Sequence, residues 1–177
     1  MKVLFLDIDG VVNCASTTQR HRGAIGIDPY MAFIVGKIQL DTGCEVVLSS
    51  TWRHWDYTRD EVRKQVVDFI DITPNSKKGF RGDEINAWLA DHPEVKRYAI
   101  LDDDSDFHED QPLFKTTWKE GITEEIAKNV TRYLNGDVKC IMCHETIGDA
   151  DMKPLNTLKR FGQMLFEHSE CPEQIKV

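Results

Sequence analysis

Short apolar runs that predict buried strands are the first feature of the chain. They fall at residues 2–8, 44–50 and 97–104, and turn-forming or polar residues bound each of them. Apolar and polar residues do not alternate within these runs, so both faces of each strand are expected to be covered. The pattern favours strands inside a sheet that carries helices on both sides.

Segments with a helical spacing of apolar residues lie between and after these runs. A helix is expected from Pro29 through about Leu40, because Pro is favoured in a first helical turn. Further helices are predicted over residues 60–70, 82–92 and 123–134. Residues 13–27 are mostly polar and contain two glycines, which predicts a loop or a small hairpin. Strands that alternate with helices indicate an α/β fold, a Rossmann-like parallel sheet flanked by helices.

The composition is that of a soluble globular protein, with 41% hydrophobic and 29% charged residues among 177. No apolar stretch approaches the roughly 20 residues needed to cross a bilayer, and the N-terminal residues do not resemble a signal peptide. We therefore expect a cytoplasmic protein with no membrane partner. The length suits one core domain, assigned to residues 1–136, and a small C-terminal segment at 137–177.

The formal net charge of -8 argues against a protein that binds nucleic acid along a broad surface, because such proteins usually carry a basic footprint. The charge leaves open a nucleic-acid end or a nucleotide as the substrate, since acidic residues can face a metal ion instead of solvent. No feature of the sequence indicates an oligomeric state.

Polar residues follow each of the three predicted strands. They are Asp7 and Asp9 after the first strand, Ser49 and Ser50 after the second, and Asp102, Asp103 and Asp104 after the third. Ligand sites in parallel sheets lie at the carboxyl ends of the strands, so these side chains are expected to converge. Clustered carboxylates repel one another unless a cation joins them, and oxygen ligands of this kind suit Mg²⁺. Each motif alone has an ordinary explanation as a turn, a cap or a solvated loop.

The order of the motifs resembles that of the haloacid dehalogenase (HAD) superfamily of phosphotransferases. "FLDIDGVVN" is similar to its first motif, "VVLSS" to its second, a basic residue near "KKGFRGDEI" to its third, and "YAILDDD" to its fourth. More narrowly, the chain resembles the small phosphatase-like domains associated with RNA-repair proteins. The resemblance covers roughly residues 1–135 and implies a HAD-like fold for the core domain.

The resemblance also implies a mechanism for phosphomonoester hydrolysis. Asp7 is expected to attack phosphorus and form an aspartyl-phosphate, while Asp9 acts as general acid and then as general base. Mg²⁺ is expected between the Asp7 carboxylate, the backbone carbonyl of Asp9, and one of Asp102 and Asp103. Ser49 is expected to hydrogen-bond a phosphoryl oxygen.

The third motif requires a basic residue that neutralises the transferred phosphoryl group. Lys77, Lys78 and Arg81 all precede the predicted helix at 82–92. Arg81 is the first candidate because it is closest to the helix and fits the narrower resemblance; Lys78 is the second. At least one of the three basic residues is expected to be an ordinary loop residue that faces solvent.

The spacing of the motifs predicts an open active site. Too few residues separate Asp9 from Ser49, and Ser49 from Arg81, for a folded cap domain beyond the loop at 13–27. An uncapped crevice suits a phosphate on a polymer end, although it also admits small phosphates.

Several residues near the motifs are candidates for substrate contact. They are Gly10, Arg20, Arg22, Ser50 and Arg53. Arginine can hold phosphate, and Trp52 or Trp55 beside Arg53 can stack on a base. The alternatives are that the two tryptophans pack at the edge of the core and that the basic residues of the 13–27 loop are simply solvated.

Two pairs of candidate metal ligands lie in the C-terminal segment. They are Cys140 and Cys143 in a C-x-x-C motif, and His168 and Cys171, which are three residues apart. Two thiolates and a His/Cys pair at the end of a helix around 155–166 would form a closed tetrahedral Zn²⁺ site. His144 is a competing ligand, and the alternative is that the two cysteines of the motif are only buried.

The sequence therefore predicts a Mg²⁺-dependent phosphatase that acts on a terminal phosphate of nucleic acid. The alternatives are a nucleoside monophosphate phosphatase and a phosphate-binding module without turnover. Intact Asp7 and Asp9 argue against the last, because a binding module has no need of the second acid. A further possibility is an adaptor that binds a partner through a zinc-containing tail.

Overall fold

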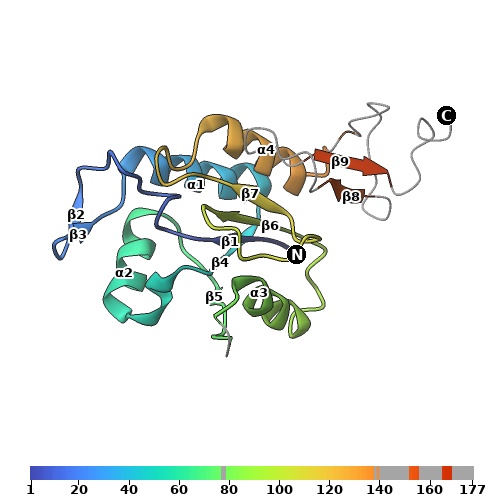
Figure 1. Cartoon of the computed structure of the whole chain (residues 1–177), viewed down its shortest axis with the longest axis horizontal. Coiled ribbons are helices and arrows are strands. Elements are labelled where there is room, and N and C mark those ends of the chain that lie inside the picture. The colour runs from blue at the N-terminus through green and yellow to red at the C-terminus, as the bar shows by residue number, and fades with distance from the viewer. Residues whose placement is uncertain (77–78, 138, 140–151, 156–164, 169–177) are drawn as a thin grey trace.

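A five-stranded parallel sheet forms the centre of the fold. The computed structural model describes residues 1–76, 79–137, 139, 152–155 and 165–168 (Figure 1). The strands are β1 (Lys2–Leu6), β4 (Glu45–Leu48), β5 (Asp71–Ile72), β6 (Arg97–Asp102) and β7 (Leu113–Lys115). Their order is β5-β4-β1-β6-β7, and every neighbouring pair is parallel. The α/β parallel sheet expected from the sequence is confirmed.

Helices cover both faces of the sheet. They are α1 (Pro29–Thr42), the 3-10 helix η1 (Thr51–His54), α2 (Asp56–Gln65), α3 (Arg81–Ala90) and α4 (Glu124–Leu134). Figure 1 shows α1 and α4 side by side on one face and α3 on the other. A hairpin of β2 (Arg20–His21) and β3 (Ala24–Ile25) projects near α2 at the end toward which β1 runs. Of the two structures expected for residues 13–27, a loop or a small hairpin, the hairpin is present.

The apolar run of β1 is buried on both faces because successive side chains point to opposite sides of the sheet. Leu4 and Leu6 pack into a core cluster that includes residues of α1 and α4. Val3 and Phe5 pack into a second cluster with residues of α3. All four side chains are 0% exposed, so β1 is held rigidly and fixes the position of the residues that follow it.

Helix α1 begins and ends at the residues that its sequence signals indicate. The Asp28 carboxylate accepts hydrogen bonds from the N–H groups of Tyr30 and Met31 at 2.9 and 3.2 Å, which caps the first turn. Gly43 ends the helix in a left-handed conformation with φ 63°. This well-capped helix spans the distance between the hairpin and β4.

The helix predicted at residues 60–70 is wrong in its boundaries. Helix α2 begins at Asp56 and ends at Gln65, and the following residues lead into β5. Phe69 is buried while Ile70 is 52% exposed, and the Ile70 N–H donates to the carbonyl of Val46 at 2.9 Å. The apolar residues after Gln65 therefore approach the sheet as a strand and do not form a helical face.

The edge strands β5 and β7 were not anticipated from the sequence. They contain two and three residues respectively, which is too short for any apolar periodicity to be visible. Their positions follow from pairing with β4 and β6.

The C-terminal segment contains an antiparallel pair, β8 (Met152–Leu155) and β9 (Leu165–His168). The helix expected around 155–166 is therefore wrong at both of its ends, and His168 lies on a strand. Cys140, Cys143, His144 and Cys171 lie outside the described residues. The zinc site remains a prediction. Within the described part of the chain, no helix is both long and apolar enough to span a membrane.

Candidate active site

The site lies at the carboxyl ends of the three central strands. Asp7 follows β1, and its N–H donates to the carbonyl of Leu101 on β6 at 3.0 Å. On the other side, the N–H of Ser49 after β4 donates to the carbonyl of Leu6 at 3.0 Å. Backbone pairing thus continues one residue beyond each strand and brings the first, second and fourth motifs together.

Three carboxylates converge at this point. One oxygen each of Asp7, Asp102 and Asp103 lie within 4.8 Å of one another. Asp102 is fully buried and Asp7 is 5% exposed. Oxygen ligands on rigid strand ends, with one side accessible, fit a Mg²⁺ ion that keeps part of its water shell. These residues therefore fit the metal that the sequence predicted, and Asp9 contributes no carboxylate to the cluster.

Arg81, the first residue of α3, joins two of these carboxylates. Its Nη1 lies 2.9 Å from Asp7 Oδ1 and 2.6 Å from Asp102 Oδ2. Burial opposes the charge of the guanidinium, but Asp102 and Asp7 raise the pKa of Arg81 above its ordinary value. A permanent cation thus bridges the acidic cluster. Lys77 and Lys78 lie outside the described residues.

Asp106, in the loop after β6, holds the start of α3 in place. Its carboxylate accepts a hydrogen bond from the Arg81 N–H at 3.2 Å, and its backbone carbonyl accepts one from the Gly82 N–H at 3.0 Å. The N-cap residue Phe80 provides no side-chain hydrogen bond, so Asp106 takes over the capping function. Asp106 positions Arg81 and was not identified from the sequence.

Burial makes the two deeper carboxyl groups weak acids in the metal-free protein. It raises the pKa of Asp7 from 3.8 to about 6, against the opposing effect of Arg81. The pKa of Asp102 rises from 3.8 to about 7 for the same reason, with the charge of Asp7 adding to it. Both groups therefore bind protons in competition with a metal ion.

We expect stabilisation by Mg²⁺ to increase with pH. In the folded metal-free protein these carboxyls keep their protons to higher pH than in the unfolded chain. Ionisation of these two carboxyl groups therefore lowers the free energy of unfolding of the metal-free protein as the pH rises from about 4 through about 7. Mg²⁺ relieves this cost only once the protons leave, so the rise in Tm on replacing EDTA by Mg²⁺ should be larger at pH 8 than at pH 5. If Mg²⁺ raised Tm equally at pH 5 and pH 8, at matched ionic strength, the assignment of these carboxylates as metal ligands would be contradicted.

Gly10 provides room for the third carboxylate. It has φ 75°, and a Cβ at this position would lie 2.2 Å from the Cγ and Oδ2 of Asp103. Its carbonyl accepts a hydrogen bond from the Thr116 hydroxyl at 2.6 Å. Glycine is therefore required by both the backbone conformation and the approach of Asp103. The proposed substrate contact of Gly10 remains a prediction.

Asp9 is held by two donors on the side of the site near the hairpin. Trp52 Nε1–H donates to Asp9 Oδ2 at 2.9 Å, and Asn13 Nδ2–H donates to Oδ1 at 2.8 Å. The indole of Trp52 is 7% exposed, so this ring is available for a hydrogen bond and not for stacking on a base. The sequence gives no signal for this polar function, since it indicates only stacking or packing for Trp52.

The two serines of the second motif have different environments. The Ser49 hydroxyl is fully buried and has no hydrogen-bond partner among the described residues. The Ser50 hydroxyl hydrogen-bonds the Asp7 carboxyl group and also caps η1 by accepting from the Trp52 N–H at 3.3 Å. Ser50 thus helps to hold Asp7 in the ionised form, while Ser49 retains an unused hydrogen-bonding group.

Arg53 is part of the framework beneath the site. It is 5% exposed, and its Nη2 lies 2.7 Å from Glu84 Oε2 on α3. Its Nη1 donates to the carbonyl of Ser50 at 3.0 Å and also to the carbonyl of Ser49. The guanidinium therefore fixes the second motif against α3. Direct contact with phosphate, which the sequence predicted, would require Arg53 to leave these partners.

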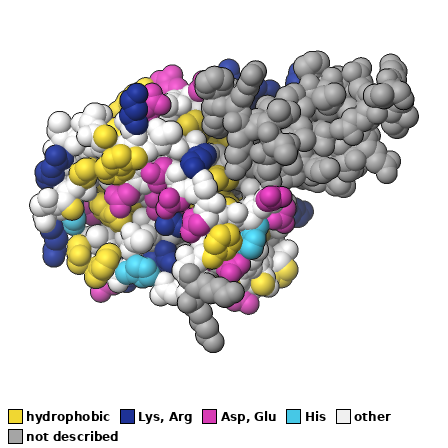
Figure 2. Space-filling view, viewed as in Figure 1, with side chains coloured by type: hydrophobic (Ala, Val, Ile, Leu, Met, Phe, Trp, Pro, Cys, Tyr) yellow, Lys and Arg dark blue, Asp and Glu magenta, His cyan; other side chains and the backbone are white. Residues whose placement is uncertain are grey.

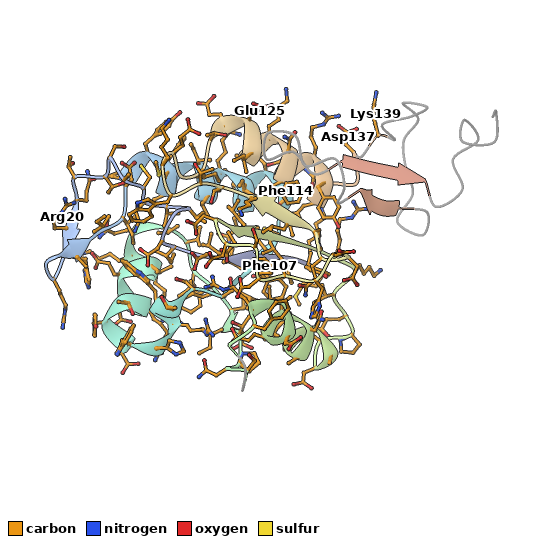
Figure 3. The ribbon with its side chains drawn as sticks, viewed as in Figure 1. Arg20, Phe107, Phe114, Glu125, Asp137 and Lys139 are labelled. Carbon is orange, nitrogen blue, oxygen red and sulfur yellow. The ribbon has the colours of Figure 1, made fainter. Side chains whose placement is uncertain are left out.

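The remaining basic candidates lie on the β2–β3 hairpin. Arg20 projects from the outer end of the molecule in Figure 3, and its Nη1 donates to the carbonyls of Thr17 and Gln19 at 2.8 Å. Arg22 is exposed at the tip, and its Cζ lies 4.1 Å from the ring centroid of Tyr57. Both lie on the hairpin at the end of the molecule toward which β1 runs, and their contact with substrate remains a prediction.

Comparison with known proteins identifies the family. Residues 3–127 match the model of the HAD domain in Swiss Army Knife RNA repair proteins. The matched range includes the acidic cluster, Arg81, and both serines of the second motif. No curated protein and no solved structure matched the chain.

Proposed function

Because the chain belongs to the family of HAD domains in Swiss Army Knife RNA repair proteins, we propose that it is a Mg²⁺-dependent phosphatase of nucleic-acid ends. The single observation that carries the proposal is the cluster of Asp7, Asp102 and Asp103, which Arg81 borders at the carboxyl end of the central strands. An acidic cluster beside a fixed cation can bind a metal ion and receive a phosphoryl group together.

The carboxylates of Asp7 and of Asp102 or Asp103, with the backbone carbonyl of Asp9, would hold Mg²⁺. The ion would supply positive charge that lets one anion approach another. All of these groups lie on strand ends or tight turns, so they need little rearrangement to bind it.

In the first half of the reaction, an oxygen of Asp7 attacks phosphorus and forms the aspartyl-phosphate bond. The bond between phosphorus and the ester oxygen breaks, and protonated Asp9 gives its proton to that leaving oxygen. The donors Trp52 and Asn13 support this role because they fix the orientation of the Asp9 carboxyl group. The dephosphorylated end then departs as a hydroxyl group.

In the second half, Asp9 removes a proton from a water molecule as the water oxygen attacks phosphorus. The bond between Asp7 and phosphorus breaks, inorganic phosphate leaves, and Asp9 is again protonated. Arg81 neutralises charge on the phosphoryl oxygens in both halves. The Ser49 hydroxyl has no partner among the described residues but is fully buried, so its proposed donation to one of these oxygens requires a movement that opens the site around it.

An end of nucleic acid is preferred as the substrate over a free nucleotide. The family description names RNA repair proteins, and the described part of the chain contains no cap domain over the site, only the small β2–β3 hairpin. The net charge of -8 favours the smaller substrate, so the nucleoside monophosphate phosphatase is the competing activity.

Phosphate release from two substrates distinguishes the two activities. We expect the full chain with Mg²⁺ to have a higher kcat/KM for a 3′-phosphorylated oligonucleotide than for a mixture of nucleoside monophosphates. A preference for the mononucleotides would make the protein a nucleotide phosphatase. Binding of the oligonucleotide without release of phosphate from either substrate would favour a phosphate-binding module.

A further inference from the structure

Four side chains from two separate segments form one stacked surface, which we call the aromatic surface. It consists of His21 and Arg22 from the β2–β3 hairpin and Trp55 and Tyr57 from the start of α2. The Tyr57 ring is nearly parallel to that of His21, at 5.9 Å and 13°, and to that of Trp55, at 6.3 Å and 26°. Arg22 lies over Tyr57 at 4.1 Å, within cation–π distance.

The aromatic surface is open to solvent and begins beside the proposed acid. Trp55 and Tyr57 are 51% and 39% exposed. Figure 2 shows basic, histidine and hydrophobic side chains together at the end of the molecule that carries the hairpin and α2. The ring of His21 lies 5.9 Å from that of Trp52, and Trp52 donates its hydrogen bond to Asp9. A chain leaving the active site on this side would therefore meet the rings.

The conformation of Arg22 is unusual and requires compensation. Among the described residues, Arg22 is the only non-glycine residue with positive φ, at 50°. Together with Gly23 it forms the two-residue turn of the hairpin, a position where asparagine or glycine would be unstrained. In this conformation the guanidinium lies over the Tyr57 ring. An observed outlier of this kind points to a function for the side chain.

The acidic side chains near the aromatic surface do not prevent an anion from approaching. Glu61 Oε1 lies 3.4 Å from His21 Nδ1 and accepts a hydrogen bond from Gln65, and Asp56 is paired with Arg59. The positive charge at the exposed tip of the hairpin therefore belongs to Arg22, with Arg20 two residues before it. Exposed aromatic rings next to an exposed cation suit a single strand of nucleic acid, which offers aromatic bases and backbone phosphates.

We propose that the aromatic surface binds the unpaired nucleotides next to the terminal phosphate. Arg22 moves from the Tyr57 ring to a backbone phosphate, and bases stack on Trp55 and on the face of Tyr57 that Arg22 uncovers. The inference rests on the proposed function, since it takes the terminal phosphate to be the group that enters the site. It adds that the substrate end is single-stranded, because in a blunt duplex only the outermost base pair has a free face and the bases behind it are covered by their neighbours.

The test measures binding in EDTA, so that no turnover contributes. The full chain and three variants are titrated against a labelled, 3′-phosphorylated single strand, with RNA and DNA in parallel, and anisotropy gives Kd. Tyr57→Leu should weaken binding by about tenfold because leucine is apolar but cannot stack on a base. Tyr57→Phe should bind within about twofold of the parent because the ring is kept.

Phe33→Leu is the matched control, since Phe33 is 66% exposed on α1 and lies near Gln65, at the opposite end of α2 from Tyr57. It should not change Kd. A blunt duplex with the same terminal phosphate should bind more weakly, and Tyr57→Leu should change its Kd less than it changes the Kd of the single strand, because only one base pair of the duplex has a free face. Equal affinity of Tyr57→Leu and parent for the single strand, or preference for the duplex, would overturn the proposal.

The two proposals fail in different ways. If the protein binds the single strand through the Tyr57 ring but releases no phosphate when Mg²⁺ is added, the phosphatase reaction is contradicted. The proposal for the aromatic surface would still hold. Phosphate release from the oligonucleotide with the same KM for Tyr57→Leu and parent would contradict the aromatic surface but not the reaction. A preference between the RNA and DNA arms would identify which nucleic acid supplies the strand.

Discussion

Asp7→Asn is expected to reduce phosphate release by at least about 1000-fold, because it removes the proposed nucleophile. The amide has nearly the same shape as the carboxylate but cannot form the aspartyl-phosphate. Asp7 is 5% exposed and lies against Asp102 and Arg81, so no other described carboxylate can take its position without moving the strands. Steady-state phosphate release with Mg²⁺ measures the loss.

The stability of the same variant separates catalysis from folding. Burial raises the pKa of Asp7 to about 6, so the ionised group is a cost to the metal-free fold at neutral pH. Asp7→Asn should therefore have a Tm in EDTA at least equal to that of the parent protein, and a smaller rise in Tm with Mg²⁺. Asp41→Asn on the exposed face of α1 is the control. Retained activity in Asp7→Asn would show that another group attacks phosphorus.

Glu84→Ala is expected to destabilise the protein by about 3–5 kcal/mol, because it leaves the guanidinium of Arg53 buried without its counter-ion. The side chains of Arg53 and Glu84 are 5% and 6% exposed, and their charged atoms lie 2.7 Å apart. Burial lowers the pKa of Arg53, and Glu84 opposes that effect. Glu84 also accepts a hydrogen bond from the Ser76 N–H at 2.9 Å. Unfolding in urea with parent and variant measures the difference.

The exposed pair Lys37–Asp41 provides the comparison for this variant. Its side chains are 59% and 38% exposed, and such pairs contribute about 0–1 kcal/mol. Asp41→Ala should therefore change stability by less than about 1 kcal/mol. If Glu84→Ala and Asp41→Ala lowered the free energy of unfolding by similar small amounts, the Arg53 guanidinium would have to form hydrogen bonds with water or with another residue in place of Glu84. Loss of activity is also expected for Glu84→Ala, since Arg53 holds the carbonyls of Ser49 and Ser50.

The central strands and the acidic motifs were predictable because each produces a local pattern. A continuous apolar run that ends in Asp7 or Asp102 indicates a buried strand with polar groups at its carboxyl end. The capped helix α1 was predictable for the same reason, since proline and glycine mark its ends. The short strands β5 and β7 contain too few residues to produce such a pattern.

The supporting contacts of the site could not be predicted because they join segments distant in the sequence. Trp52 and Asp9 are 43 residues apart, and Arg53 and Glu84 are 31 apart. A tryptophan after a strand gives no local signal that its N–H serves a carboxylate. Arg53 beside two tryptophans resembles a nucleotide contact in the sequence, and only its burial shows that it holds the framework together.

The phosphorylated form of the enzyme provides the most direct test of the account. A single turnover with excess enzyme is quenched in acid, and mass analysis of the peptides locates any phosphoryl group on the chain. We predict a transient phosphoryl group on the peptide that contains Asp7, absent in Asp7→Asn. Phosphate release by the parent protein with no phosphorylated peptide at any time would contradict the mechanism and indicate direct attack by water.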